Sequence, residues 1–181
     1  MSEDKKLELI KNRIIEQISE NMKAYGYART IGRVLAIIHY EGKPMNLDEL
    51  SEKTGMSKTR MSQVLREMDE LNIAEKIFVK GSRKDTYIVE EDYYQMFLTL
   101  VTHNWRDLVS RNKRVEERLL RDLKEIIQNK ETSEEEKAIA KSYYEDSLDS
   151  LNYFDWIDRL ADFFESKEIF KHVPIKENED K

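Results

Sequence analysis

The sequence predicts a mainly α-helical protein with a small β-hairpin, and three observations support that prediction. Apolar residues recur at spacings of three and four along most of the 181 residues, as they do on one face of a helix. Only 5 glycines and 2 prolines interrupt them, so loops are few. Between Ile73 and Val89, two short runs with strand preference flank the polar turn Lys80–Asp85, which is the pattern of a hairpin.

Composition narrows the class of protein. Hydrophobic residues make up 39% of the chain and charged residues 38%, a balance typical of amphipathic helices rather than of disorder. The absence of cysteine excludes disulfides and thiolate chemistry and fits a reducing cytoplasm. The N-terminal segment lacks the apolar core of a signal peptide, and no apolar run approaches the roughly 18 residues of a membrane helix. We therefore expect a soluble, cytoplasmic protein that does not contact membranes.

The N-terminal part of the chain predicts two helices. Residues 5–24 form a helix with one apolar stripe, and Gly26 ends it. Thr30 is the expected N-cap of a second helix, and residues 41–44 form the turn that follows. The stripe of the first helix consists of Leu7, Ile10, Ile14, Ile18 and Met22, and the inward face of the second consists of Ile31, Val34, Leu35 and Ile38.

A helix-turn-helix and a hairpin follow. A short helix begins at Asn46 or Asp48, and Gly55 suits the left-handed position after its last turn. Ser57 is a good N-cap for the next helix, which runs to about Leu71. Strands at residues 73–79 and 86–89 complete the order of a winged helix-turn-helix. The inward face of the second helix consists of Met61, Val64, Leu65 and Met68.

Long helices flank this module. Glu91 opens a helix that either continues to residue 126 or breaks near Asn112, and Thr132 or Ser133 caps a last helix. Their apolar stripes exceed what a small winged domain buries alone, so we expect a homodimer held by these helices. The expected parts are a dimerisation helix (1–26), the winged helix-turn-helix (27–90), a helical dimerisation and effector region (91–173) and a flexible tail (174–181).

The second helix of a helix-turn-helix places its N-terminal side chains in the major groove. Here that end carries hydrogen-bond donors and no acidic residue. Arg60 can pair with guanine and Gln63 with adenine, whereas Arg66 suits the DNA backbone. The wing holds three cations in five residues, and its Arg83 suits a narrow minor groove. The candidate DNA-binding residues are Ser57, Lys58, Thr59, Arg60, Ser62, Gln63, Arg66, Lys80, Arg83 and Lys84, with base and phosphate contacts left open.

The charge distribution is compatible with this interpretation. The formal net charge is −6, but residues 57–84 hold 7 Lys and Arg against 4 Asp and Glu. Residues 115–181 hold 11 Lys and Arg against 19 Asp and Glu. Phosphates sense local charge, because salt screens interactions beyond about 8–10 Å. The basic segment therefore permits DNA binding by an acidic protein.

The segment GKPMNLDELSEKTGMSKTRMSQVLREMDELNIAEKIFVKGSRKDTYIV resembles the winged helix of the GbsR branch of MarR-type regulators. The resemblance covers roughly residues 5–125, and MSKTRMSQVLREM is its most specific part. It implies a homodimeric repressor of genes for glycine betaine synthesis or uptake that responds to choline or a related osmolyte. It also implies that residues 57–63 begin the recognition helix and that residues 80–84 form the wing.

A quaternary ammonium effector has no hydrogen-bond donor, and proteins hold such groups among aromatic rings. Several rings cluster by sequence around the junction of the winged module and the long helices. An aromatic stripe at helical spacing is also the pattern of ordinary core packing, and that alternative stays open. The candidate effector-binding residues are Tyr40, Tyr94, Phe97 and Trp105.

No catalytic or metal-binding pattern stands out. The three histidines lie far apart in sequence, and no phosphate-cradling glycine loop is present. We therefore expect no enzyme, no cofactor and no metal. The alternative to a DNA-binding regulator is a winged-helix module that binds another protein without specific DNA binding. Its weak point is the cationic wing, which makes a poor hot spot for a protein partner.

Overall fold

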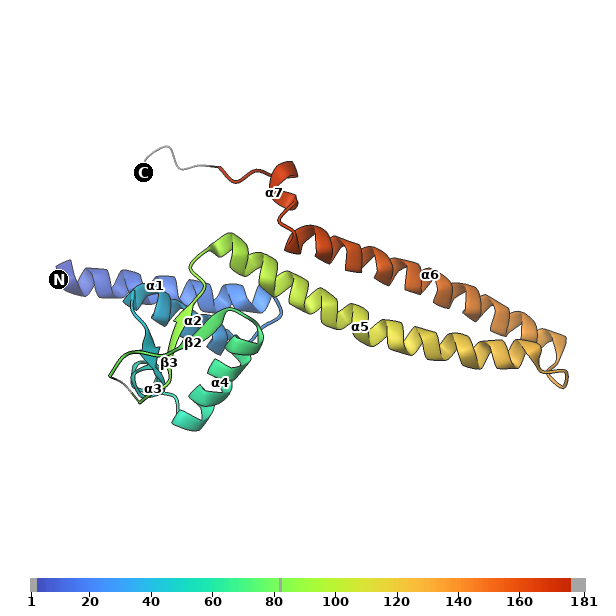
Figure 1. Cartoon of the computed structure of the whole chain (residues 1–181), viewed down its shortest axis with the longest axis horizontal. Helices are drawn as coiled ribbons and strands as arrows, with labels where there is room; N and C mark the ends of the chain where they lie inside the picture. Colours follow the sequence, from blue (N-terminus) through green and yellow to red (C-terminus); the bar gives the residue numbers. More distant parts are fainter. Residues whose placement is uncertain (1–2, 82, 177–181) are drawn as a thin grey trace. The chain divides into compact units, whose positions relative to one another are not determined.

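The computed structural model describes residues 3–81 and 83–176 and divides the chain into two compact units, Met1–Leu100 and Val101–Lys181 (Figure 1). Helix α5 (Tyr93–Gln128) contributes residues to both units. The expected wing residue Ser82 and the last part of the expected tail, residues 177–181, lie outside the described residues. The division into four parts expected from the sequence remains a proposal.

The first unit begins with two helices that pack closely, α1 (Glu3–Ala24) and α2 (Arg29–Glu41). Gly32 allows this approach, because a Cβ there would lie 2.8 Å from the carbonyl oxygen of Ile18. Met22 is buried against α2, as predicted. The start of the predicted apolar stripe, at Leu7 (64% exposed) and Ile10, is exposed in the single chain.

Helix α2 has the predicted inward face but not the predicted cap. Ile31, Val34, Leu35 and Ile38 are all buried. The N-cap position is Ala28, which has no capping side chain, so the prediction of Thr30 was wrong. The hydroxyl of Thr30 is buried inside the first turn and has no hydrogen-bond partner among the described residues. The sequence pattern misplaced the cap because a polar residue near a helix start is not always the one that precedes it.

The helix-turn-helix consists of α3 (Leu47–Thr54) and α4 (Lys58–Glu70). Asn46 caps α3 through a capping box with Glu49, which settles the choice between Asn46 and Asp48. Gly55 has φ +72°, the left-handed conformation expected of it. Ser57 caps α4 by accepting a hydrogen bond from the Arg60 backbone N–H. The four predicted inward residues of α4, Met61, Val64, Leu65 and Met68, are fully buried.

A three-stranded antiparallel sheet closes the module in the order β1-β3-β2, with strands β1 (Met45–Asn46), β2 (Ala74–Ile77) and β3 (Thr86–Val89). Strand β3 has the predicted bounds. Strand β2 ends at Ile77, so Phe78 and Val79 leave the ladder and enter the wing. Strand β1 was not predicted, because two residues carry no periodicity and gain strand geometry only by pairing with Tyr87 and Thr86.

The second unit is a helical hairpin of the remainder of α5 and helix α6 (Glu134–Glu165), followed by α7 (Ile169–His172). Helix α5 does not break near Asn112, whose side-chain amide donates to the Leu108 carbonyl at 2.8 Å. Ser133, rather than Thr132, caps α6 in a capping box with Glu136. The hairpin core consists of Val109, Phe154 and Ile157, with Trp105 and Leu108 packed against it.

Ion pairs between α5 and α6 accompany this apolar core. The Arg106 guanidinium contacts the carboxylates of Asp158, Asp162 and Glu165, and these partners raise its pKa further. Lys113 contacts Asp158 as well. Helices α5 and α6 are therefore joined by an ion-pair network on top of an apolar core, which limits sliding of one helix past the other.

Candidate nucleic-acid interface

The N-terminal half of α4 presents its polar side chains to solvent while the opposite face of the helix is buried. This division follows from helical spacing, because the buried Met61, Val64 and Leu65 orient the intervening positions outward. The Arg60 guanidinium lies near the side-chain oxygen of Gln63 at 3.4 Å. All seven candidate DNA-binding residues of this helix end are exposed: Ser57, Lys58, Thr59, Arg60, Ser62, Gln63 and Arg66.

Asp48 joins this helix end to the wing. Its carboxylate contacts Lys58 of α4 at 2.6 Å and Lys84 of the wing at 2.7 Å. Hydrogen bonds from Lys58 and then Lys84 lower the pKa of Asp48 to about 2. The sequence pattern does not predict Asp48 as part of the interface, because Asp48 lies 10 residues from one partner and 36 from the other. No local spacing connects these three residues, and only the fold brings them together.

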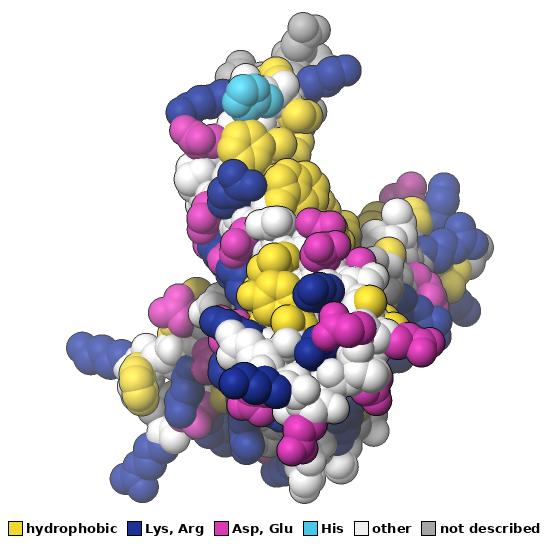
Figure 2. All heavy atoms as spheres, turned by 90° about the vertical axis from the view of Figure 1, so that its right-hand side faces the viewer, with side chains coloured by type: hydrophobic (Ala, Val, Ile, Leu, Met, Phe, Trp, Pro, Cys, Tyr) yellow, Lys and Arg dark blue, Asp and Glu magenta, His cyan; other side chains and the backbone are white. Residues whose placement is uncertain are grey.

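The wing places further cations in solvent. Lys80 and Arg83 are exposed and form no ion pair with other described residues. Lys76, at the base of the wing, contacts Asp85 at 2.7 Å. Figure 2 shows Lys and Arg side chains projecting from the surface among acidic and apolar ones. Among the described residues, Arg60 and Arg66 of α4 likewise form no ion pair, whereas Lys58 and Lys84 have a carboxylate partner.

The candidate effector residues have different neighbours within their own units. Tyr40 hydrogen-bonds to Tyr93, and this bond, together with burial, raises the pKa of Tyr93 to about 12. The His39 ring lies 4.9 Å from that of Tyr40 and 5.6 Å from that of Tyr93. His39, Tyr40 and Tyr93 therefore form one aromatic group, and only Tyr40 of the three is a candidate effector residue from the sequence.

The other candidate rings have different neighbours. Phe97 packs edge-on against Tyr25, with ring centroids 5.9 Å apart. Tyr94 is about half exposed on the first turn of α5. Trp105 belongs to the second unit, where it packs against Phe164 and the hairpin core. Core packing, the alternative left open by the sequence, therefore accounts for Trp105.

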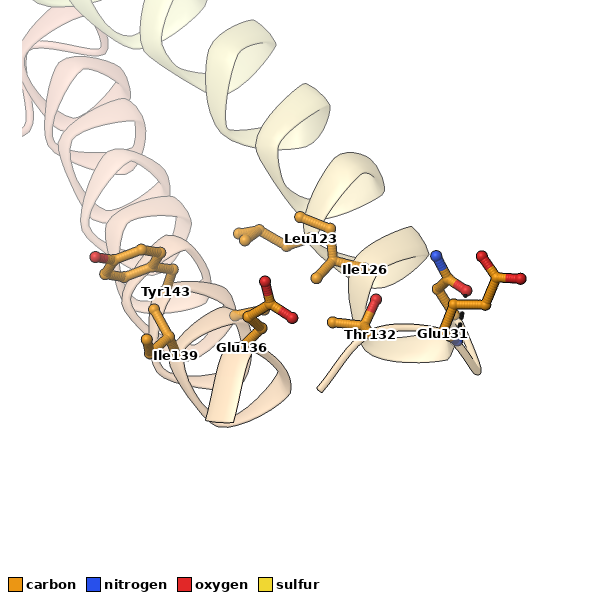
Figure 3. A pocket seen from close by; sticks show the side chains of 9 residues that line it. Leu123, Ile126, Glu131, Thr132, Glu136, Ile139 and Tyr143 are labelled. Atoms are coloured by element: carbon orange, nitrogen blue, oxygen red, sulfur yellow. Dashed lines mark hydrogen bonds between the residues drawn. The ribbon is translucent and has the colours of Figure 1, made fainter. Parts of the chain in front are cut away.

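A recess of about 500 Å³ lies at the closed end of the helical hairpin. Leu123 and Ile126 of α5 face Ile139 and Tyr143 of α6 across it (Figure 3). Thr132 of the connecting turn also lines it. Aliphatic and polar side chains line it in equal number together with the ring of Tyr143, and it contains none of the candidate effector residues.

Within residues 3–81 and 83–176, no three His, Asp or Glu side chains are grouped as metal ligands would be. In the same part of the chain, no helix combines the length and apolarity that crossing a membrane requires.

The chain is similar in sequence and fold to known proteins. Residues 93–171 match the model of the GbsR family transcriptional regulator, C-terminal helical hairpin. The chain is 49% identical over 168 residues to the HTH-type transcriptional repressor OpcR of Bacillus subtilis (strain 168), covering 93% of this chain and 91% of that protein. It is 32% identical over 170 residues to the HTH-type transcriptional repressor GbsR of the same organism, covering 94% of each. A crystal structure of a transcriptional regulator with 15% identity and a TM-score of 0.51, covering 84% of this chain and 98% of that one, supports the fold.

Proposed function

We propose, because this chain belongs to the GbsR family of transcriptional regulators, that it is a homodimeric repressor that binds operator DNA through α4 and the wing. One observation carries the DNA-binding part of the proposal. The exposed end of α4 offers only hydrogen-bond donors and cations, and the carboxylate of Asp48, which contacts it, is paired with both Lys58 and Lys84. Such a surface suits phosphates and the edges of bases.

The homodimer is supported by apolar side chains that the single chain leaves in solvent. Leu7, Leu9 and Ile10 are exposed on the first part of α1. The helical hairpin exposes more of them along its length, namely Val115, Leu119, Ile126, Ile139, Tyr143, Leu148, Tyr153 and Trp156. Contiguous exposed apolar surface is uncommon on monomers and marks interaction sites. A second copy of the chain would cover these faces and set the spacing of two α4 helices on DNA.

The target genes and the effector follow from the resemblance of this chain to its family. We propose that it represses genes for uptake or synthesis of an osmoprotectant and that a quaternary ammonium compound, choline or glycine betaine, modulates it. The effector must bind the operator-binding state and the non-binding state of the protein with different affinity, because equal affinity shifts neither population. The exposed rings Tyr40 and Tyr94 remain the candidate contacts, whereas Trp105 has a packing role of its own.

The first experiment is selection from a pool of duplexes with random centres, followed by sequencing of the bound fraction. We expect enrichment of an inverted repeat whose halves lie about one or more helical turns apart, because a two-fold dimer presents two identical helices. Sedimentation of the free protein measures the dimer directly. If no sequence is enriched and unselected duplexes show no salt-dependent retention, the protein-binding module is favoured instead.

Effector binding has its own measurement. Thermal unfolding with choline, glycine betaine and carnitine is compared for wild type, Tyr94→Leu and Trp105→Leu. A ligand that binds the folded state raises the melting temperature. Tyr94→Leu should abolish this rise. Trp105→Leu should lower the ligand-free melting temperature, because Trp105 packs against Phe164. No rise with any of the three compounds would overturn the proposed effector class.

A further inference from the structure

Phe78 is the most exposed large apolar side chain of the described residues, with 91% of its surface in solvent. It is the first residue after β2, which ends at Ile77, and it lies two residues before the wing. Val79, next to it, is also exposed. Single exposed apolar residues are common on proteins, so the position of Phe78, rather than its exposure alone, is the informative fact.

The surroundings of Phe78 are cationic. Lys80 and Arg83 follow it on the same loop and have no ion-pair partner among the described residues. A partner that covers Phe78 must therefore supply negative charge and a flat or apolar surface at the same place. A protein hot spot seldom combines the two, because interface cores are depleted of charge. A DNA duplex does combine them, since phosphates line both edges of a groove whose floor and walls are bases and sugars.

We propose that Phe78 is a DNA-contacting residue that presses its ring against a base step in the minor groove while Lys80 and Arg83 hold the flanking phosphates or groove edge. The proposal rests on the proposed DNA-binding function and adds a residue and a mode of reading to it. Apolar wedges of this kind partly unstack a base step and bend the duplex. The wing would then favour steps that unstack easily, such as pyrimidine–purine steps, without hydrogen-bonding to their bases.

The test compares wild type, Phe78→Ala and the matched control Val79→Ala on the duplex that wild type selects. Phe78→Ala should weaken binding by about 10- to 100-fold, the effect of leaving one phenyl ring in water. Val79→Ala should change it by less than about threefold. The slope of log affinity against log salt should not change in Phe78→Ala, because an apolar ring releases no counterions. Both variants should fold normally, since neither side chain belongs to the core.

A spectroscopic measurement isolates the wedge itself. 2-Aminopurine, whose fluorescence rises when it is unstacked, is placed at successive positions of the selected duplex. Wild type should brighten it at one step in each half-site, and Phe78→Ala should not. Unchanged affinity in Phe78→Ala, or equal brightening by both proteins, would overturn the proposal. A Phe78→Ala protein that sediments as a monomer would identify a second copy as the occupant and also overturn it. Failure of wild type to bind any duplex would instead refute the proposed function.

Discussion

The ammonium group of Lys84 on the wing lies 2.7 Å from the carboxylate of Asp48 at the start of α3. The same carboxylate contacts Lys58 at the start of α4. One acidic residue thus connects the two cations that the proposed interface would direct toward phosphates. A phosphate oxygen that binds Lys58 or Lys84 would have to share that ammonium group with the Asp48 carboxylate or displace the carboxylate.

Asp48→Asn should therefore strengthen binding to all duplexes alike and steepen its salt dependence, because Lys58 and Lys84 each lose a carboxylate that competes with phosphates. Titration of a selected and an unselected duplex at several salt concentrations measures both effects. Asp85→Asn is the matched control, since it removes the same charge from the wing but releases Lys76, which is not a candidate contact. Equal gains in the two variants would attribute the effect to net charge, and weaker binding by Asp48→Asn would make Asp48 a support that DNA does not displace.

The same ion pair predicts a dependence of stability on pH. The folded-state pKa of Asp48, about 2, lies below the ordinary value of an aspartate, near 4. The stabilisation is therefore present above pH 4 and disappears as the pH falls from about 4 to about 2. Urea unfolding across that range should show a shallower loss of stability for Asp48→Asn than for wild type. Parallel curves would show that the contact is too solvent-exposed to stabilise the fold.

Arg60→Ala should weaken binding to the selected duplex by about 1–3 kcal/mol and relax the preference at one base position in each half-site, because a bidentate guanine contact would be lost. Arg66→Ala, further along the same exposed face, should weaken selected and unselected duplexes to the same extent. Repeating the random-duplex selection with each variant separates the two outcomes. If Arg60→Ala returns the wild-type sequence at every position, base reading belongs to other residues of α4.

Tyr27→Phe should change stability in alkaline solution. The Tyr27 hydroxyl donates to the Leu100 carbonyl at 2.9 Å, and burial, with the charge of Glu67, raises the pKa of Tyr27 to about 12. A raised folded-state pKa means that the stabilisation is complete below pH 10 and is lost as the pH rises from about 10 to about 12.

In urea unfolding, Tyr27→Phe should lose about 1 kcal/mol at pH 8, the usual contribution of one hydrogen bond. It should then decline less than wild type between pH 10 and 12. Tyr143→Phe, at an exposed position of α6, is the control and should follow wild type throughout. A Tyr27→Phe curve parallel to that of wild type would contradict the assignment of the alkaline loss to this hydroxyl.

Features that depend on near neighbours in the chain were predictable from the sequence. The cap at Ser57, the left-handed Gly55 and the inward face of α4 follow from spacings of a few residues, and the structure confirms all three. The bounds of β3 follow in the same way. Hydrophobic periodicity and capping act within one or two turns of a helix, so the sequence expresses them directly.

Features that join distant segments were decided only by the tertiary structure. Strand β1 exists because β3 lies beside it, and Gly32 is required because α1 crosses there. The grouping of Asp48 with Lys58 and Lys84, and of His39 with Tyr93, arises from helices and loops that the chain brings together over tens of residues. The physical reason is that a local pattern determines which face of an element is apolar, whereas packing determines what that face meets and which charges end as neighbours. For this chain, the sequence alone determined the winged helix-turn-helix and its candidate DNA-binding residues. The tertiary structure decided which of those cations are paired with a carboxylate, and it left the ring of Phe78 exposed beside the wing.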